Sequence, residues 1–528
     1  MVLRMSQLVK FLRKAAALLL LPLLAWSCQL VTDDYDVELT PDSPTPQFIN
    51  VTISVSAGNN PFTRANPTGG EYGDGPETGS ESENAVTDIT LIFYQDNVGI
   101  NTTNPAAKVV CVKKYDVYPY DETYIPDDHN HKAVEPSDVQ AGEVLYTTGE
   151  KELDETSLVA GETYKVLVVA NAPDGLTIAE NSPISAVRDQ VLSTVYAGNG
   201  VGISATNFVM ASETDATISL TNPTLYTSAT ESEKNRYVYY FDCIHIERLA
   251  ARLDFWAKNS NGYKTSSDNA SYTTSGYEYT VKNPDGGATL DRFVLTSITP
   301  FNLNNGTGSV EYLFKRTNDV NNRYLHNEVP TTVSAPGNWV LDPTTLLKYD
   351  SSHPTYFAST LTSVIGNMHN AFNVTIAGQQ ANKFSVTNGG FTADNIIVGY
   401  CKENTLNPAG TSRLYYYATG LAFEGYYYSK GTGTGVRCVF YHFIRHQGES
   451  NSAYQAYTSD NINDAKNSFC PALLALNPNP NTPAMNFGIV RNNIYRVSID
   501  KVSAIGGFLQ LSIKEMRWRH VDNPVIYI

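Results

Sequence analysis

Apolar and polar residues alternate along many short segments of this chain. The clearest segment is "FINVTISVSA" (48–57), in which Ile49, Val51, Ile53 and Val55 share one side. Strict alternation predicts a half-buried β-strand, because successive side chains of a strand point to opposite faces. Runs of β-prone residues predict further strands at 86–95, 163–171, 237–246, 251–259, 291–301, 394–401, 435–445 and 492–506.

Two segments show helical spacing instead. The segment 182–195 offers Ser182 as a cap and Pro183 at the first helical position, where a missing N–H costs nothing. The segment 359–372 places its apolar residues at helical intervals as well. Helices are therefore expected to be minor elements.

The loops between the predicted strands are long and polar. The stretch 57–84 contains few apolar residues, so we expect a mobile loop that buries nothing. The β-rich pattern restarts near residue 240, which predicts an all-β chain of two domains, 65–238 and 239–528. The abundance of tyrosine, 34 residues, favours β-structure too.

The first 28 residues have the layout of a lipoprotein signal peptide. Four basic residues precede the apolar run 15–25, which is too short to cross a bilayer, and Ser27 directly precedes Cys28. We expect Cys28 to be lipidated, although an ordinary secretion signal with an incidental cysteine is the alternative. Residues 29–46 then form a tether rich in Asp, Thr and Pro.

The charge balance restricts the partners. The chain of 528 residues carries 53 acidic and 37 basic residues, a net charge of −16. This excess of acid disfavours nucleic acid and anionic membrane as ligands. The six cysteines form no CxxC pair, so we expect neither a disulfide framework nor a metal site.

No motif in the sequence predicts catalysis. The stretch "KGTGTGVR" (430–437) leads into a strand, which favours a hairpin turn over a phosphate-binding loop. The stretch 126–132 holds two Asp and two His residues, and a solvated loop is the favoured interpretation. His446 and Glu449 lie close in sequence without a nucleophile motif. We expect no enzyme activity, no cofactor and no catalytic residue.

Arg64 lies in the polar loop "NPFTRANPTGG" (60–70), between the strand near 48–57 and the rest of the chain. Cleavage of the Arg64–Ala65 bond would cut the covalent link to that strand. A strand that then left its sheet would expose unpaired backbone groups and a row of apolar pockets, which form a template for another strand.

The last residues, Val525, Ile526, Tyr527 and Ile528, are apolar and β-prone. They need a receiving surface, either in this molecule or in the vacated groove of the next one. The second choice gives a head-to-tail contact that does not close, and hence a filament. The alternative is that Arg64 is an ordinary loop residue and that the C-terminal strand pairs within its own domain.

Several sequence segments together resemble the Bacteroidales fimbrillins, the type V pilins of the Mfa1 and FimA kind. The most specific is "IVRNNIYRVSIDKVSAIG" (489–506), and the others follow in the same order as in that family. They are "ENAVTDITLIFY" (83–94), "TYKVLVVAN" (163–171), "IERLAARLDF" (246–255), "VFYHFIRH" (439–446) and "MRWRHV" (516–521).

The resemblance implies two transthyretin-like β-sandwich domains and a lipoprotein precursor anchored in the outer membrane through Cys28. It also implies removal of residues 29–64 by an arginine-specific protease and polymerisation by strand exchange, with the donor strand within roughly 517–528. The partners would be other fimbrial subunits, in a homopolymer or with accessory pilins, and a host or bacterial surface ligand. The chain would end in a surface fimbria.

Two other functions remain open at this point. The chain would serve as a tip or accessory adhesin if it were needed in few copies. It would serve as a monomeric glycan-binding surface lipoprotein if the tyrosines at 415–417 or 426–428 formed an exposed platform.

Overall fold

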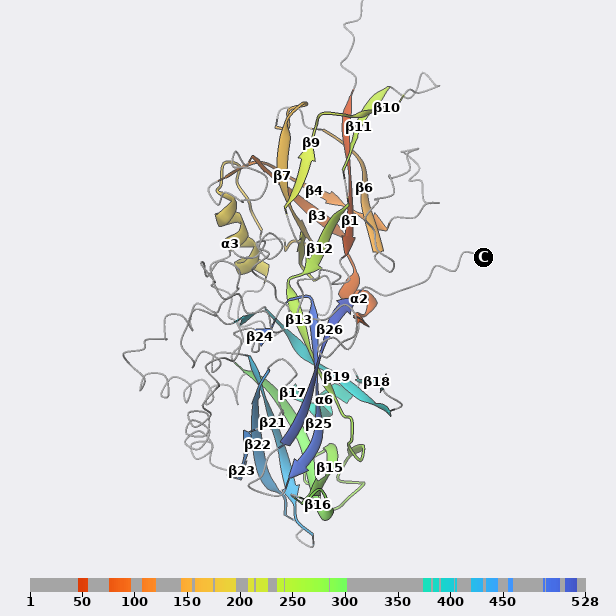
Figure 1. Ribbon diagram of the computed structural model, residues 1–528, viewed down its shortest axis with the longest axis vertical. Helices are drawn as coiled ribbons and strands as arrows, with labels where there is room; N and C mark the ends of the chain where they lie inside the picture. The colour runs from red at the N-terminus through yellow and green to blue at the C-terminus, as the bar shows by residue number, and fades with distance from the viewer. Residues whose placement is uncertain are drawn as a thin grey trace, which may run out of the picture.

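The computed structural model of the chain describes residues 46–55, 76–95, 107–119, 144–153, 157–173, 176–195, 208–212, 215–226, 235–241, 243–283, 285–301, 374–380, 383–388, 391–402, 404–405, 419–430, 434–444, 454–458, 488–489, 491–503 and 509–519. Strands are the main secondary structure of these residues, and the helices are few and short. Most of the strands belong to two large sheets that form sandwich-like domains, which lie one above the other in Figure 1. The predicted all-β class with minor helices is confirmed.

The first sheet contains 11 described strands, in the main order β10-β11-β1-β12-β8-β7-β3-β4, with β6 on the other side of β1. Their bounds are β1 (Gln47–Val55), β3 (Asp88–Gln95), β4 (Lys108–Asp116), β5 (Tyr118–Pro119), β6 (Val144–Glu152), β7 (Thr163–Ala170), β8 (Met210–Ser212), β9 (Ala216–Ser219), β10 (Thr224–Tyr226), β11 (Arg236–Tyr240) and β12 (Ile244–Arg248). Helix α3 (Ile184–Val195) lies beside this sheet (Figure 1).

The second sheet contains 13 described strands, in the main order β18-β19-β13-β25-β15-β16-β21-β22-β23. Their bounds are β2 (Pro76–Thr78), β13 (Ala250–Trp256), β14 (Tyr263–Lys264), β15 (Gly276–Lys282), β16 (Ala288–Phe301), β17 (Val374–Thr375), β18 (Lys383–Asn388), β19 (Phe391–Lys402), β21 (Gly420–Tyr428), β22 (Val436–Phe443), β23 (Tyr454–Thr458), β25 (Asn493–Ser503) and β26 (Leu509–Arg519). Two short helices, α2 (Glu81–Asn84) and α6 (Ile376–Gln379), and a separate pair, β20 (Asn404–Thr405) with β24 (Gly488–Ile489), complete the described elements.

Each sheet has its own hydrophobic core. The first core is built around β1, β3 and β7, and the second around β13, β16, β21 and β25. Strands β12 and β13 belong to the first and the second sheet and are separated only by the buried residue Leu249, while β2 places the earlier residues 76–78 in the second sheet as well. The domain bounds 65–238 and 239–528 stay a prediction.

Most predicted strands are confirmed as elements with shifted ends. The run 237–246 is the exception, because it divides into β11 and β12. Helix α3 begins at Ile184, directly after Pro183, and buries Ile184, Val187 and Val191 against the first core. Strands β21 and β22, on the two sides of the predicted turn, pair antiparallel, as a hairpin requires. The segment 359–372 lies outside the described residues.

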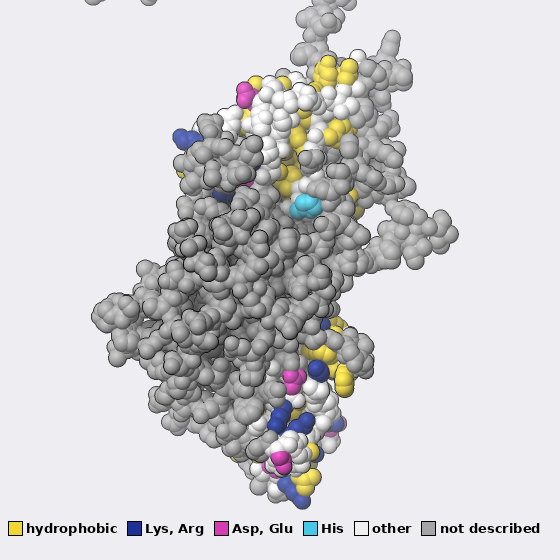
Figure 2. Space-filling model, viewed as in Figure 1, with side chains coloured by type: hydrophobic (Ala, Val, Ile, Leu, Met, Phe, Trp, Pro, Cys, Tyr) yellow, Lys and Arg dark blue, Asp and Glu magenta, His cyan; other side chains and the backbone are white. Residues whose placement is uncertain are grey.

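The visible face in Figure 2 mixes side chains of different kinds. Acidic and basic side chains are interspersed at its lower end, and hydrophobic ones appear in separate spots at the upper end and at the lower right. Among the described helices, none has the length and apolarity required to span a membrane.

Candidate functional site

Strand β1 lies inside the first sheet, with neighbours on both of its edges. Its first half pairs in parallel with β11, from Gln47 opposite Tyr237 to Asn50 opposite Tyr240. Its second half pairs in parallel with β12, from Ile53 opposite Ile244 to Val55 opposite Ile246. Along the other edge it pairs antiparallel with β6. Figure 1 shows β1 running along the upper sheet between these neighbours.

The apolar face of β1 belongs to the first core. Ile49, Val51, Ile53 and Val55 are each at most 1% exposed and pack in the same cluster as Tyr239, Ile244 and Ile246. Each buried aliphatic side chain contributes about 1.5–3 kcal/mol. Loss of β1 would therefore open a continuous apolar groove and leave the facing edges of β6, β11 and β12 without their partner.

The polar face of β1 is buried too, which corrects the prediction of a half-buried strand. Asn50, Thr52 and Ser54 are at most 5% exposed. The alternation predicted correctly which side chains share a face of β1, but it did not indicate that both faces are buried. Asn50 and Ser54 form hydrogen bonds to the neighbouring strands, which compensates for the burial of polar groups.

The segment after the Arg64 loop belongs to the second sheet. Strand β2 pairs in parallel with β26, from Pro76 opposite Arg517 to Thr78 opposite Arg519. Helix α2 follows with a capping box: Ser80 accepts a hydrogen bond from the backbone of Glu83, and the Glu83 carboxylate accepts one from the backbone of Ser80. A sequence pattern of Ser-x-x-Glu is the usual signature of this cap.

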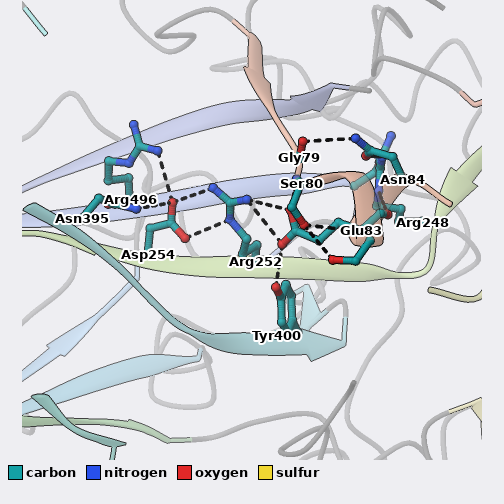
Figure 3. Close-up of polar contacts among 12 residues, drawn as sticks. Gly79, Ser80, Glu83, Asn84, Arg248, Arg252, Asp254, Asn395, Tyr400 and Arg496 are labelled. Atoms are coloured by element: carbon teal, nitrogen blue, oxygen red, sulfur yellow. Dashed lines mark hydrogen bonds and ion pairs between the residues drawn. The ribbon is translucent and has the colours of Figure 1, made fainter. Parts of the chain in front are cut away.

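Glu83 corrects the prediction that the stretch 57–84 buries nothing. Its side chain is fully buried and points to Arg252 on β13 and Tyr400 on β19 of the second sheet (Figure 3). It accepts hydrogen bonds from Arg252 at 3.0 Å and from the Tyr400 hydroxyl at 2.5 Å. The polar composition of the stretch did not prevent burial, because a charge is tolerated inside a protein when it is paired and hydrogen-bonded.

Arg248, the last residue of β12 in the first sheet, forms hydrogen bonds to helix α2. Its Nε donates to the backbone carbonyl of Glu83 at 3.1 Å, and its Nη1 donates to Asn492 at 3.0 Å. It also donates to the side chain of Asn84 (Figure 3). Complete burial lowers the pKa of Arg248 to about 10, so the guanidinium remains charged at neutral pH.

Arg252 is held by two carboxylates. It forms a two-pronged contact to Asp254, with both distances 2.9 Å, in addition to its pairing with Glu83. Burial disfavours its charge, but the Asp254 and Glu83 carboxylates outweigh burial and raise the pKa of Arg252 above its usual range. Asp254 also accepts a hydrogen bond from Arg496 at 3.2 Å. We call Glu83, Arg248, Arg252, Asp254 and Arg496 the junction cluster.

The junction cluster joins segments that are far apart in sequence. Glu83 lies in the segment 83–94, Arg248 and Arg252 in 246–255, and Arg496 in 489–506. These are three of the segments that carry the resemblance to fimbrillins. Sequence reasoning interpreted them as strands and missed the cluster. The available signal was the set of charged residues inside otherwise apolar strands, together with the Ser80–Glu83 capping pattern.

No protein-family model and no curated protein match this chain. Solved structures do match it. One is a candidate cell adhesion protein from Parabacteroides distasonis, with 12% identity, coverage of 90% of this chain and 98% of that one, and a TM-score of 0.39. A second is the tip fimbrial protein Mfa3 from Porphyromonas gingivalis with a C-terminal truncation, at 10% identity, 89% and 99% coverage, and a TM-score of 0.31. A third is a fimbrilin, FimA, from the same organism, at 12% identity, 91% and 99% coverage, and a TM-score of 0.34.

The structural neighbours of this chain are fimbrial and cell adhesion proteins. They are of the kind that the sequence resemblance named.

The sequence-predicted site residues lie outside the described residues. These are Cys28, Arg64, Ala65, Val525, Ile526, Tyr527 and Ile528, and their roles stay predictions. The predicted loops at 126–132 and around His446 and Glu449, and the tyrosines 415–417, also lie outside them. In the described part of the chain, no three His, Cys, Asp or Glu side chains lie close enough to hold a metal ion.

The C-terminal strand β26 is tied into the second sheet. It pairs antiparallel with β25 over its length, from Leu509 opposite Val502 to Arg517 opposite Asn493. Part of the predicted donor region is therefore already paired in the second sheet, because Arg517 pairs with β25 and residues 517–519 pair with β2. A donor segment that leaves this pairing intact has to begin after Arg519.

Proposed function

We propose that this chain is a structural subunit of a bacterial surface fimbria, exported as a lipoprotein through Cys28. A protease cuts after Arg64, strand β1 leaves the first sheet, and a strand of another subunit takes its place. The neighbouring subunits are thereby joined through a continuous sheet. Adhesion is the activity of the assembled fibre.

The single observation that carries the proposal is the position of β1. It fills the first sheet between β6 and the β11–β12 edge, and both of its faces are buried. In sequence, its link to the rest of the described chain runs through residues 56–75, which contain Arg64. Cleavage there would convert a built-in strand into a ligand held by noncovalent contacts alone.

The junction cluster supports the same proposal. It fixes residues 79–84 to β13 and β19 through Glu83, on the far side of the Arg64 loop from β1. Cleavage would therefore leave the new N-terminal segment attached to the second sheet. After the cut, β1 would be free to leave the first sheet while residues 79–84 stayed bound to the second sheet.

The test uses the bacterium that makes the protein, in which the other fimbrial subunits are present. Wild-type chain, Arg64→Ala and the control Thr63→Ala are each produced there, and fimbriae are analysed for SDS-resistant ladders with an antibody to this chain. We expect ladders for wild type and Thr63→Ala, and uncut monomer for Arg64→Ala. Incorporation of Arg64→Ala into ladders as efficiently as wild type would contradict the proposal.

A tip or accessory position is the second outcome of the same experiment. A cleaved chain found in a single small complex instead of a ladder would favour it. Deletion of 522–528 separates the two positions further, because a shaft subunit needs to donate a strand as well as to accept one.

A further inference from the structure

The buried polar face of β1 is an unusual feature for a strand whose place in the sheet is set by a hydrophobic core. Asn50, Thr52 and Ser54 are 3%, 5% and 0% exposed. Burial of polar groups costs free energy unless they are hydrogen-bonded, so the groove has to supply partners for them.

Both walls of the groove supply such partners. On the β6 wall, Thr147 Oγ1 donates to Asn50 Oδ1 at 2.8 Å. On the β12 wall, Ser54 Oγ lies 3.0 Å from His245 Nδ1, and the two residues stand opposite each other in the parallel register. The polar face of the occupant is therefore contacted once from each side, at Asn50 near the middle of β1 and at Ser54 near its end.

A third contact involves the backbone of the occupant. The register between β1 and β6 shifts between Asn50 and Thr52, and at this irregularity the Val51 N–H donates to Thr148 Oγ1 at 3.1 Å. Thr148 is buried. A proline at the position of Val51 would have no N–H to donate and would lose this bond.

We propose that the groove is specific for a strand with the pattern of β1. This strand runs in the direction of β1, places branched aliphatic side chains against the core, and presents Asn, Thr or Ser to Thr147 and His245. The inference rests on the proposed strand exchange and names its partner: a fimbrial subunit of different sequence from this chain.

The chain's own C-terminal residues do not fit this pattern. Residues 525–528 are Val-Ile-Tyr-Ile, so one register turns Ile526 and Ile528 to the polar walls and the other turns Val525 and Tyr527 to them, and neither presents Asn, Thr or Ser there. Pro524 precedes them and brings a residue without an N–H into the same segment. The occupant is therefore a strand from a different polypeptide, and this chain's tail serves a groove on another subunit.

The experiment measures the binding of labelled peptides to purified full-length protein that has been cut after Arg64 and incubated in mild urea to release the first fragment. The peptides are residues 46–56, the same peptide with Asn50→Val, Thr52→Val and Ser54→Val, and residues 518–528. We expect the natural 46–56 peptide to bind at least about tenfold more tightly than either of the others. Uncut Arg64→Ala protein is the control and should bind none of them.

A groove variant tests the residues themselves. In Thr147→Val/His245→Leu, folded with its own β1 still attached and then cut, the preference for the polar-faced peptide should fall or reverse. Equal binding of all peptides to the natural groove, or tighter binding of 518–528, would overturn the specificity while leaving strand exchange intact. Failure of every peptide to enter the cut protein would overturn the specificity and the proposed function together.

Discussion

At the scale of single residues, the junction cluster shows how a polar segment is fixed inside a β-protein. Glu83 is fully buried and compensated by Arg252, Tyr400 and the backbone of Ser80. Removal of one member of a buried ion pair is strongly destabilising, because the remaining charge stays buried without its counterpart. The junction cluster therefore depends on the Glu83 carboxylate.

We expect Glu83→Gln to lower the free energy of unfolding by about 3 kcal/mol, which urea titration measures. The matched control is Ser82→Ala, an exposed neighbour on the same helix, which should change the stability by less than about 0.5 kcal/mol. Equal stability of the two variants would show that Glu83 does not hold the junction.

Lys402, at the end of β19, gives a prediction about pH. It is 4% exposed, and burial lowers its pKa to about 8. Below about pH 8 the folded protein holds a charged, buried lysine, which is costly. Between about pH 8 and 10.5 the unfolded chain binds more protons at this group than the folded chain does, so the cost disappears as pH rises.

We therefore expect Lys402→Met to stabilise the protein at pH 7 by up to about 3 kcal/mol, and to have little effect near pH 10.5. Unfolding of both proteins in urea at pH 7 and pH 10.5 measures the difference. If the stabilisation by Lys402→Met increased with pH, the buried charge of Lys402 would not be its cause.

At the scale of elements, β1 is the strand whose release from the first sheet the proposed function requires. Its apolar face packs into the first core, and the neighbouring strands pair with both of its edges. We expect Ile53→Ala to destabilise the first sheet by about 2–4 kcal/mol, and to speed the loss of the N-terminal fragment after cleavage.

The control for Ile53→Ala is Leu225→Ala on β10, because Leu225 is 48% exposed. Urea titration measures stability, and size-exclusion chromatography after cleavage measures release of the fragment. Fragment release at the same rate in both variants would show that the Ile53 contact does not hold β1 in place.

The elements also show what the sequence could predict. Alternation located β1, and runs of β-prone residues located β3, β7, β13 and β25, because branched and aromatic side chains are enriched in strands. The burial of both faces of β1 left no signal, since Asn, Thr and Ser look solvent-exposed in a pattern. The short elements β2 and α2 were missed because their stability comes from distant partners, β26 and Arg252, and not from their own composition.

At the scale of the whole molecule, the Arg64 loop lies in sequence between two segments with different attachments. Residues 47–55 are held in the first sheet, and residues 76–84 are held against the second sheet and the junction cluster. A single cut between them, followed by loss of β1, would leave a vacant strand position in the first sheet. Head-to-tail filling of that position by neighbours gives a fibre without a closed symmetry.

The most direct measurement uses a variant in which a disulfide holds β1 in the first sheet. Phe48 and Glu152 stand opposite each other on β1 and β6, and Phe48→Cys/Glu152→Cys would place a disulfide across the groove. This protein is cut after Arg64 and mixed with labelled peptide 46–56, with and without reductant. The account predicts uptake of the label after reduction and none while the disulfide is intact. Uptake with the disulfide intact, or no uptake after reduction, would contradict it.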